Sequence, residues 1–209
     1  ASRNASDSQS MVDTADGALQ ETQNVLLRMR ELAVQSANGT LTDADRDHTD
    51  AEFQQLEAEL TRISDNTTFA GTELLDGTVS SLSFQIGEGA NQTISISIAD
   101  MDASGLSLNT NDLQDAANSQ TAITAIDAAI DTVATQRGTL GAVSNRLSST
   151  VANLDQINVN LSSSKGRIQD ADFAAETGNL AKGQILQQAA TAMLAQANAS
   201  KQQVLTLIR

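Results

Sequence analysis

The sequence predicts a mainly α-helical protein, an elongated rod of long coiled-coil-like helices that carries one small β-hairpin. Three observations predict this fold class. Apolar or small residues alternate at spacings of three and four between Ile123 and Leu161, the 3.5-residue period that packs one helix along another. The 209 residues contain no proline, which would interrupt helices. They contain no tryptophan or tyrosine and only four phenylalanines, so burial depends on aliphatic side chains and alanine.

Composition also narrows the classes of partner. The formal net charge is −14, from 26 acidic and 12 basic side chains, whereas binding to phosphate backbones or anionic membranes needs a cationic surface. The absence of cysteine excludes disulfides and thiolate metal sites. No segment approaches the roughly 18 consecutive apolar residues of a membrane span. We therefore expect neither nucleic-acid binding nor membrane insertion.

The first helix is predicted from about residue 6 to residue 37. Asn38, Gly39 and Thr40 end it, because glycine readily adopts the left-handed conformation that terminates helices. Its apolar or small side chains follow spacings of four and three, at Met11, Ala15, Ala18, Thr22, Val25, Met29, Leu32 and Ser36.

A second helix is predicted from about residue 43 to residue 65. Three aspartates in its first turns suit the positive end of the helix dipole. One face carries Phe53, Leu56, Leu60 and Ile63.

After Gly71 the period of the pattern changes from 3.5 to two. Apolar residues alternate with polar ones on both sides of a glycine-containing turn at residues 87–91, which predicts a β-hairpin over about residues 82–98. The alternating positions are Leu82, Phe84, Ile86, Ile94, Ile96 and Ile98. The segment of residues 102–112 is short, polar and glycine-containing, and we expect a loop there.

The long helix follows, with its stripe running from Ile123 to Leu161. Arg137 and Asn158 interrupt this stripe, so we expect them to cost stability and to set the register between helices. The stripe consists of residues 123, 126, 130, 133, 137, 140, 144, 147, 151, 154, 158 and 161. Residues 162–166, rich in serine and containing glycine, are expected to break the helix.

The last helix is predicted from about residue 171 to residue 209, with apolar residues on more than one face. A single neighbouring helix cannot cover such a surface, so this segment is the candidate assembly element, while a fourth helix of an ordinary bundle stays open. The candidate assembly residues are Leu180, Ile185, Leu186, Met193, Leu194, Val204, Leu205 and Ile208.

Catalytic and metal-binding patterns are weak. The single histidine, His48, lies in no HExxH arrangement. The aspartates at 43, 45 and 47 resemble the start of a calcium loop, but the sixth position is His48 where glycine is required and the twelfth is Gln54 where glutamate is required. No nucleophile-elbow, phosphate-binding or dinucleotide-binding glycine pattern occurs. We therefore predict no enzyme, no cofactor and no metal site.

Several motifs together resemble those of bacterial flagellins. Residues 26–40, Leu-Leu-Arg-Met-Arg-Glu-Leu-Ala-Val-Gln-Ser-Ala-Asn-Gly-Thr, resemble the most recognisable N-terminal motif of that family. Residues 66–71 resemble its NTxFxG turn, and Phe-Gln-Ile-Gly at 84–87 its hairpin strand. Residues 163–198 resemble its C-terminal signature, with Arg-Ile-Gln-Asp-Ala-Asp-Phe at 167–173 and Gln-Ile-Leu-Gln-Gln-Ala at 184–189. The resemblance covers nearly the whole chain.

The resemblance implies a structural subunit of the flagellar filament, in a minimal form without outer variable domains. Residues 1–165 would form the inner rod domain and residues 166–209 the C-terminal helix of the inner tube. It also implies export from the cytoplasm by the flagellar secretion apparatus to an extracellular filament. The implied partners are other copies of the chain, a flagellin export chaperone at the C-terminal helix, and hook-associated proteins.

The first four residues, Ala-Ser-Arg-Asn, resemble an internal flagellin sequence. We therefore expect the extreme N-terminal helix of the family to be missing from this chain. The last helix would then lack its partner, and this form would be monomeric or held by a helical partner such as the chaperone.

The resemblance further implies recognition by an animal Toll-like receptor through Arg28, Leu32 and Glu52. Arg28 would offer a bidentate guanidinium group, Leu32 an apolar contact and Glu52 an acceptor. The alternative is that Leu32 belongs to the apolar stripe and the two charged residues are solvated. Leu27 stands where the better-known receptor-binding flagellins have glutamine.

Two other functions stay open. A hook–filament junction protein shares flagellin-like ends. A cell-surface flagellin homologue could act as an adhesin, although the chain has no tryptophan or tyrosine on which sugars could stack.

Overall fold

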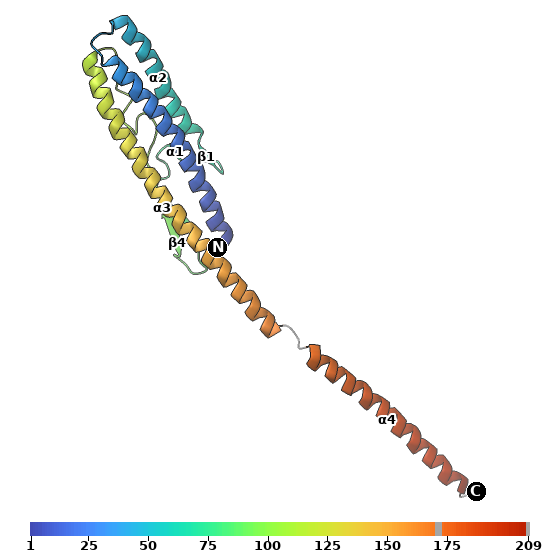
Figure 1. Cartoon of the computed structure of the whole chain (residues 1–209). Helices are drawn as coiled ribbons and strands as arrows, with labels where there is room; N and C mark the ends of the chain where they lie inside the picture. Colours follow the sequence, from blue (N-terminus) through green and yellow to red (C-terminus); the bar gives the residue numbers. More distant parts are fainter. Residues whose placement is uncertain (170–172, 208–209) are drawn as a thin grey trace. The chain divides into compact units, whose positions relative to one another are not determined.

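The computed structural model describes residues 1–169 and 173–207, with side chains through Lys201 (Figure 1). Contacts divide the chain into two units, Ala1–Ile157 and Asn158–Arg209. The elements are α1 (Ser2–Ser36), α2 (Asp43–Asn66), β1 (Thr68–Phe69), β2 (Thr72–Glu73), β3 (Leu82–Gln85), β4 (Thr93–Ile96), α3 (Ala116–Gln169) and α4 (Phe173–Leu207). The predicted fold class, mainly α with long helices, is confirmed.

Within the first unit, α1 lies between α2 and α3 (Figure 1). Several polar contacts join α1 to α3, and the residue number rises along α1 as it falls along α3, so the two helices are antiparallel. The contacts are Ser2 to Asp155 at 3.4 Å, Gln9 to Ser144 at 2.6 Å, Asp16 to Arg137 at 2.9 Å, Gln23 to Arg137 at 2.8 Å, and Arg30 to Asp127 at 2.6 Å.

The buried surface of α1 is wider than the predicted stripe. Six of the eight predicted positions are buried, while Ala18 and Val25 are half-buried. A second row with the same three-and-four spacing is also buried, because α1 is covered by helices on two sides. The complete row consists of Ala5, Ser8, Val12, Ala15, Leu19, Thr22, Leu26, Met29, Ala33 and Ser36.

On α3 the buried row differs from the predicted stripe at several alternate positions, where the residue one place earlier in the sequence is buried. Ile126, Val133, Leu140 and Leu147 are buried seven residues apart, as predicted. Four other predicted positions, Ile123, Ile130, Arg137 and Ser144, are half-buried. The structure instead buries Ala122, Ala129 and Val143, each one residue before a predicted position, and also Ser119, ahead of the predicted stripe. Small side chains lie along the centre of the row, and the larger half-buried ones lie along its edge.

The shift places Arg137 at the edge of the helix pair. Its Nε donates to Asp16 Oδ1 at 2.9 Å, and its Nη1 donates to Gln23 Oε1 at 2.8 Å. The hydrogen bond from Arg137 to the Asp16 carboxylate raises the pKa of Arg137. The positive charge in the stripe is therefore paired across to α1, where it pins one register.

The predicted break at residues 162–166 is wrong, because α3 continues to Gln169. Serine and glycine in a helix interior cost only about 0.5–1 kcal/mol each relative to alanine, and no proline intervenes. Past Val151 the stripe loses its cover, and Leu161, in the second unit, is 65% exposed. The predicted last helix is confirmed as α4.

The predicted hairpin is confirmed as β3 and β4, which pair antiparallel with Leu82 opposite Ile96 and Phe84 opposite Ile94. A second hairpin, β1 with β2, was not predicted. Its two-residue turn is Ala70 (φ 51°) and Gly71 (φ 82°), both with the positive φ that a type I′ turn requires. The strands are only two residues long, too short for a period-two pattern to reveal.

The segment between β4 and α3 has no regular structure, as predicted, yet it is not simply polar. Its apolar side chains complete the core of the first unit, at Ile98, Met101, Ala103, Leu106, Leu108 and Leu113. Two backbone hydrogen bonds tie it to the chain after β2, from Ile98 N to Val79 O at 3.0 Å and from Met101 N to Leu75 O at 2.8 Å.

The turn between α1 and α2 is built around Arg46, whose side chain is 6% exposed. Its guanidinium donates to the backbone carbonyls of Ser36 at 3.1 Å, Asn38 at 2.9 Å and Leu41 at 2.9 Å. The Ser36 carbonyl lies at the negative end of the α1 dipole, which favours a cation. Arg46 thus holds the end of α1 to the beginning of α2.

The start of α2 is fixed by a capping box between Thr42 and Asp45. The hydroxyl and the backbone amide of Thr42 both donate to the Asp45 carboxylate and lower its pKa. The carboxylate is needed for this cap. Its stabilisation is therefore present above the unfolded-state pKa and is lost as pH falls through the lowered folded-state value.

Replacing Leu147 by aspartate is expected to unfold the α1–α3 pair. Leu147 is 0% exposed, and an unpaired carboxylate there should cost about 3–5 kcal/mol. The melting temperature of the cooperative transition, followed by circular dichroism, measures this loss. Asn145→Asp, at an exposed position on the same helix, should melt close to the original chain. Equal melting of the Leu147→Asp variant would contradict the placement of Leu147.

Replacing Arg46 by methionine is expected to lower the free energy of unfolding by about 2–4 kcal/mol, because three carbonyl groups lose their donors while side-chain volume is nearly kept. Urea unfolding measures the difference. Arg62→Met serves as the matched control, since Arg62 is exposed on the same helix and pairs only locally with Glu59. If both variants unfold at the same urea concentration, Arg46 does not hold the turn.

Candidate interaction surfaces

Arg28 and Glu52 form a surface pair between neighbouring helices. Arg28 on α1 donates to Glu52 Oε1 on α2 through Nε at 2.9 Å and Nη2 at 2.7 Å. Its Nη1 donates to Glu31 at 3.0 Å. The hydrogen bond with Glu52, followed by the one with Glu31, raises the pKa of Arg28. About half of each side chain of the Arg28–Glu52 pair is exposed, so both can reach a binding partner.

Leu32, the third residue of the predicted receptor site, lies in the core and is 2% exposed. The structure therefore brings Arg28 and Glu52 together at the surface and leaves Leu32 beneath it. The exposed apolar side chains beside this pair are Leu27 and Val34, which line a shallow groove with Arg30, Glu31 and Gln35. Sequence analysis missed Val34, because its exposure depends on which faces of α1 are covered.

The second candidate surface is the apolar side of α4. Leu180, Ile185, Leu186, Met193 and Leu194 are between 60% and 71% exposed, and Phe173 at the start of the helix is 83% exposed. The side chains of Val204 and Leu205, and the whole of Ile208, lie outside the described residues. Five of the eight predicted assembly residues are therefore exposed on α4.

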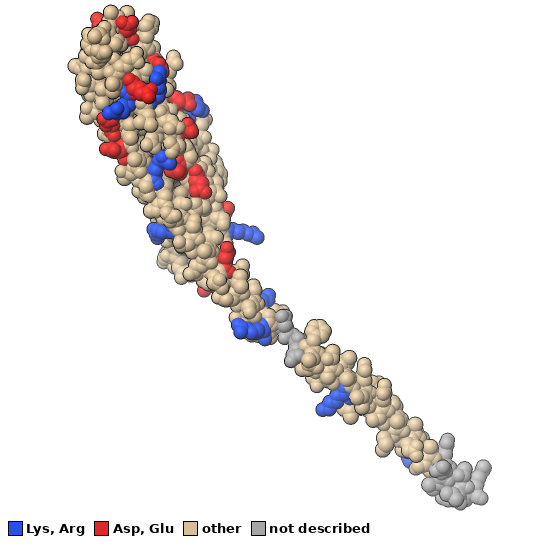
Figure 2. Space-filling model, in the orientation of Figure 1, with Lys and Arg blue, Asp and Glu red and all other residues tan. Residues whose placement is uncertain are grey.

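Charge is distributed unevenly between the two units. Residues 1–157 contain 23 acidic and seven basic side chains, whereas residues 158–209 contain three acidic and five basic ones. Figure 2 accordingly shows the red and blue side chains gathered on the first unit, with few on the visible face of α4. The surface of α4 is thus large, apolar and nearly uncharged. Exposed apolar surfaces of this kind are typical of protein–protein contacts.

The acidic residues at the start of α2 belong to the N-terminus of the helix, where carboxylates are favourable. Asp43 and Asp47 are exposed, Asp45 belongs to the capping box, and His48 is exposed beside them. No group of three or more possible metal ligands occurs among the described residues, and no described helix is long and apolar enough to cross a membrane.

Arg46 is the structural residue that sequence analysis missed in this region. The available signal was a lone arginine between aspartates, a few residues after the predicted end of the first helix. Such an arginine can return to the free carbonyls at the end of the preceding helix. The predicted left-handed conformation of Gly39 is wrong, because α1 ends with Ala37 as a right-handed C-cap and Gly39 has no positive φ.

Comparison with known protein families gives two matches along the chain. The model of the bacterial flagellin N-terminal helical region matches residues 1–80, and that of the bacterial flagellin C-terminal helical region matches residues 123–208. Together they cover α1, α2, β1, β2 and most of α3 and α4.

Curated relatives match over the whole chain. The flagellin of Halalkalibacterium halodurans is 44% identical over 211 residues, which cover 100% of this chain and 78% of the relative. The flagellin of Bacillus subtilis is 40% identical over 243 residues, which cover 100% of this chain and 80% of the relative.

Solved structures share the fold. The crystal structure of Bacillus cereus flagellin has a TM-score of 0.66 at 36% identity, covering 73% of this chain and 89% of that one. A putative flagellar hook-associated protein from Vibrio parahaemolyticus has a TM-score of 0.65 at 15% identity, covering 79% and 88%. The second likeness concerns the fold alone.

Proposed function

Since the chain belongs to the bacterial flagellin family, whose members build the extracellular flagellar filament, we propose that the apolar surface of α4 is the surface through which this structural subunit assembles. The observation that carries the proposal is the exposure of five large apolar side chains on one helix. The chain is a structural protein and not an enzyme. The family accounts for filament formation, and α4 supplies a specific surface for it.

The distribution of side chains on α4 requires more than one neighbour. Leu180 and Leu194 lie toward one side of the helix, while Ile185 lies toward another, with Leu186 and Met193 between them, so a single packed helix would leave part of the surface in water. Helices of neighbouring copies surround α4 in the proposed assembly. Residues 166–209 then form the inner-tube helix, and residues 1–165 form the inner rod.

The apolar side chains of α4 must offset the cost of association. Each large aliphatic side chain contributes about 1.5–3 kcal/mol when fully buried, and association costs at least about 4 kcal/mol in lost freedom of motion. Several of the five side chains must therefore be buried together. The same surface is the proposed binding site of the export chaperone before secretion, and hook-associated proteins are the proposed neighbours at the end of the filament.

Replacing Leu186 by aspartate is expected to abolish assembly without unfolding the first unit. The test extends the chain ahead of Ala1 with the N-terminal helix of the Bacillus subtilis flagellin and measures filaments by analytical ultracentrifugation. The extended chain should sediment as filaments, whereas its Leu186→Asp variant should not, because a carboxylate cannot be buried among apolar helices.

The matched control is Gln188→Asp, an exposed polar position two residues after Leu186 and on nearly the opposite side of α4. This variant should assemble like the extended chain, because the added carboxylate lies away from Leu186 and Met193. Filaments of the Leu186→Asp variant at normal yield would contradict the assembly surface on α4.

We further propose that the Arg28–Glu52 pair contributes to recognition by an animal Toll-like receptor. Two observations favour it: the pair is half-exposed and held in one geometry by 2.7 and 2.9 Å hydrogen bonds, and Leu27 and Val34 add apolar surface beside it. A charged group with apolar neighbours is a common arrangement at binding hot spots. Leu32 acts indirectly in this proposal, by packing α1 in the core.

Arg28→Ala is expected to weaken binding to the purified receptor ectodomain at least tenfold, or about 1.4 kcal/mol, measured by surface plasmon resonance. Arg62→Ala is the control, because Arg62 is also exposed and paired with a glutamate, but lies away from Arg28 along α2. Equal affinity of the Arg28→Ala variant and the original chain would remove this residue from the site.

A further inference from the structure

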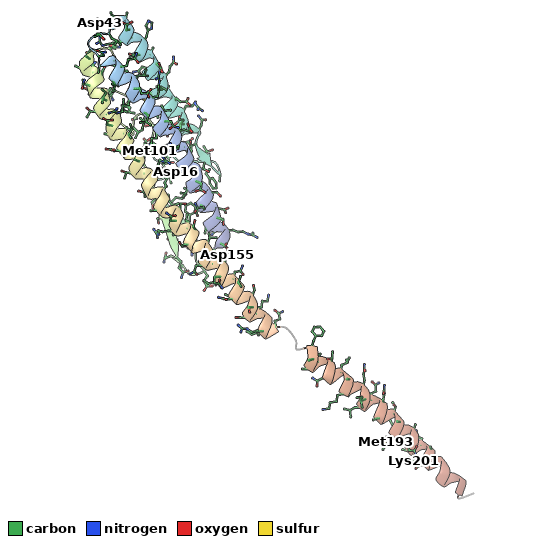
Figure 3. All side chains as sticks on the ribbon, viewed as in Figure 1. Asp16, Asp43, Met101, Asp155, Met193 and Lys201 are labelled. Carbon is green, nitrogen blue, oxygen red and sulfur yellow. The ribbon has the colours of Figure 1, made fainter. Side chains whose placement is uncertain are left out.

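The four methionines of the chain divide sharply by exposure. Met11, Met29 and Met101 are between 0% and 2% exposed in the core of the first unit, whereas Met193 on α4 is 71% exposed. Figure 3 labels one of each kind: Met101 lies among the helices of the first unit, and Met193 projects from the second. The thioether of Met193 is therefore open to reagents in solution, while the other three are reached only when the first unit opens.

Competing oxidisable side chains are scarce. The chain contains no cysteine, no tryptophan and no tyrosine, so methionine sulfur is its most readily oxidised group. We propose that Met193 is a peroxide-sensitive modification site, and that its oxidation to the sulfoxide impairs the apolar surface of α4 before that surface is covered. The second part of this inference rests on the proposed assembly function.

The reaction needs only a two-electron oxidant of the hydroperoxide class. The sulfur lone pair of Met193 attacks one oxygen of hydrogen peroxide, an S–O bond forms as the O–O bond breaks, and the proton of the transferred hydroxyl passes to the departing hydroxide. The products are methionine sulfoxide and water, with sulfur oxidised by two electrons and the peroxide reduced by two. The sulfoxide is polar and strongly hydrogen-bonding, whereas the thioether is apolar.

The position of Met193 makes this change effective. Four apolar residues share its side of the helix. They are Leu186, seven residues before it, Ala189 and Ala190, four and three residues before it, and Ala197, four residues after it. Leu194 adjoins it. A sulfoxide at this point introduces a strong hydrogen-bond acceptor beside Leu186 and the three alanines, and burying it against apolar groups leaves that acceptor unsatisfied.

The test treats the full chain with hydrogen peroxide and follows each methionine by peptide mass spectrometry. Met193 is expected to gain one oxygen at least tenfold faster than Met11, Met29 or Met101. Retention of the treated chain on a phenyl column should fall, whereas Met193→Leu, which keeps the apolar volume but cannot be oxidised, should keep its retention after treatment. Equal oxidation rates at the four methionines, or unchanged retention of the oxidised chain, would overturn the inference.

A second experiment tests the effect of oxidation on assembly and uses the chain extended by the flagellin N-terminal helix. Treated chain should lose filament yield about tenfold, and treated Met193→Leu should keep it. Full yield from chain oxidised at Met193 would overturn the effect on assembly. If the untreated extended chain forms no filaments, it is the proposed assembly function that fails, and the mass spectra and column retention still decide whether Met193 is the sensitive site.

Discussion

The packing of α1 against α3 is the constraint on which the first unit depends. Both helices place a buried row at alternating spacings of three and four, and this period allows two helices to stay in contact over many turns. The small residues Ala15, Ala122 and Ala129 lie in these rows and are fully or almost fully buried. With no tryptophan or tyrosine in the chain, stability comes from many aliphatic contacts of modest size.

Polar groups at the edges and ends make this packing specific. Asp16 with Arg137 and Arg30 with Asp127 join α1 to α3 at two levels, so a slip of either helix by one turn would separate both pairs. Arg46 fixes the turn that brings α2 against α1. The apolar segment between β4 and α3 then fills the remaining space. These contacts are individually small or local, but each excludes an alternative arrangement of the same apolar helices.

The sequence predicted the helices, the β3–β4 hairpin and the uncovered character of α4, because these features depend on periodicity within one segment. It did not predict that Ala122 and Ala129 would be buried more deeply than Ile123 and Ile130. That choice depends on how closely two distant segments approach. Leu32 was predicted in the apolar stripe and is buried, whereas the pairing of Arg28 with Glu52 follows from the position of α2. The role of Arg46 follows from the path of the turn. The prediction of a break at residues 162–166 failed because a few weak helix formers cost less than the hydrogen bonds that an interrupted helix would lose.

The functional account depends on the contrast between a first unit with its own core and a terminal helix whose apolar side chains remain exposed. Hydrogen–deuterium exchange tests it most directly, comparing the free chain with filaments of the chain extended by a flagellin N-terminal helix. The account predicts that buried segments of α1 and α3 exchange slowly in both states, whereas α4 exchanges rapidly in the free chain and becomes strongly protected in filaments. Exchange of α4 that is equally rapid in filaments and in the free chain would contradict burial of this surface on assembly.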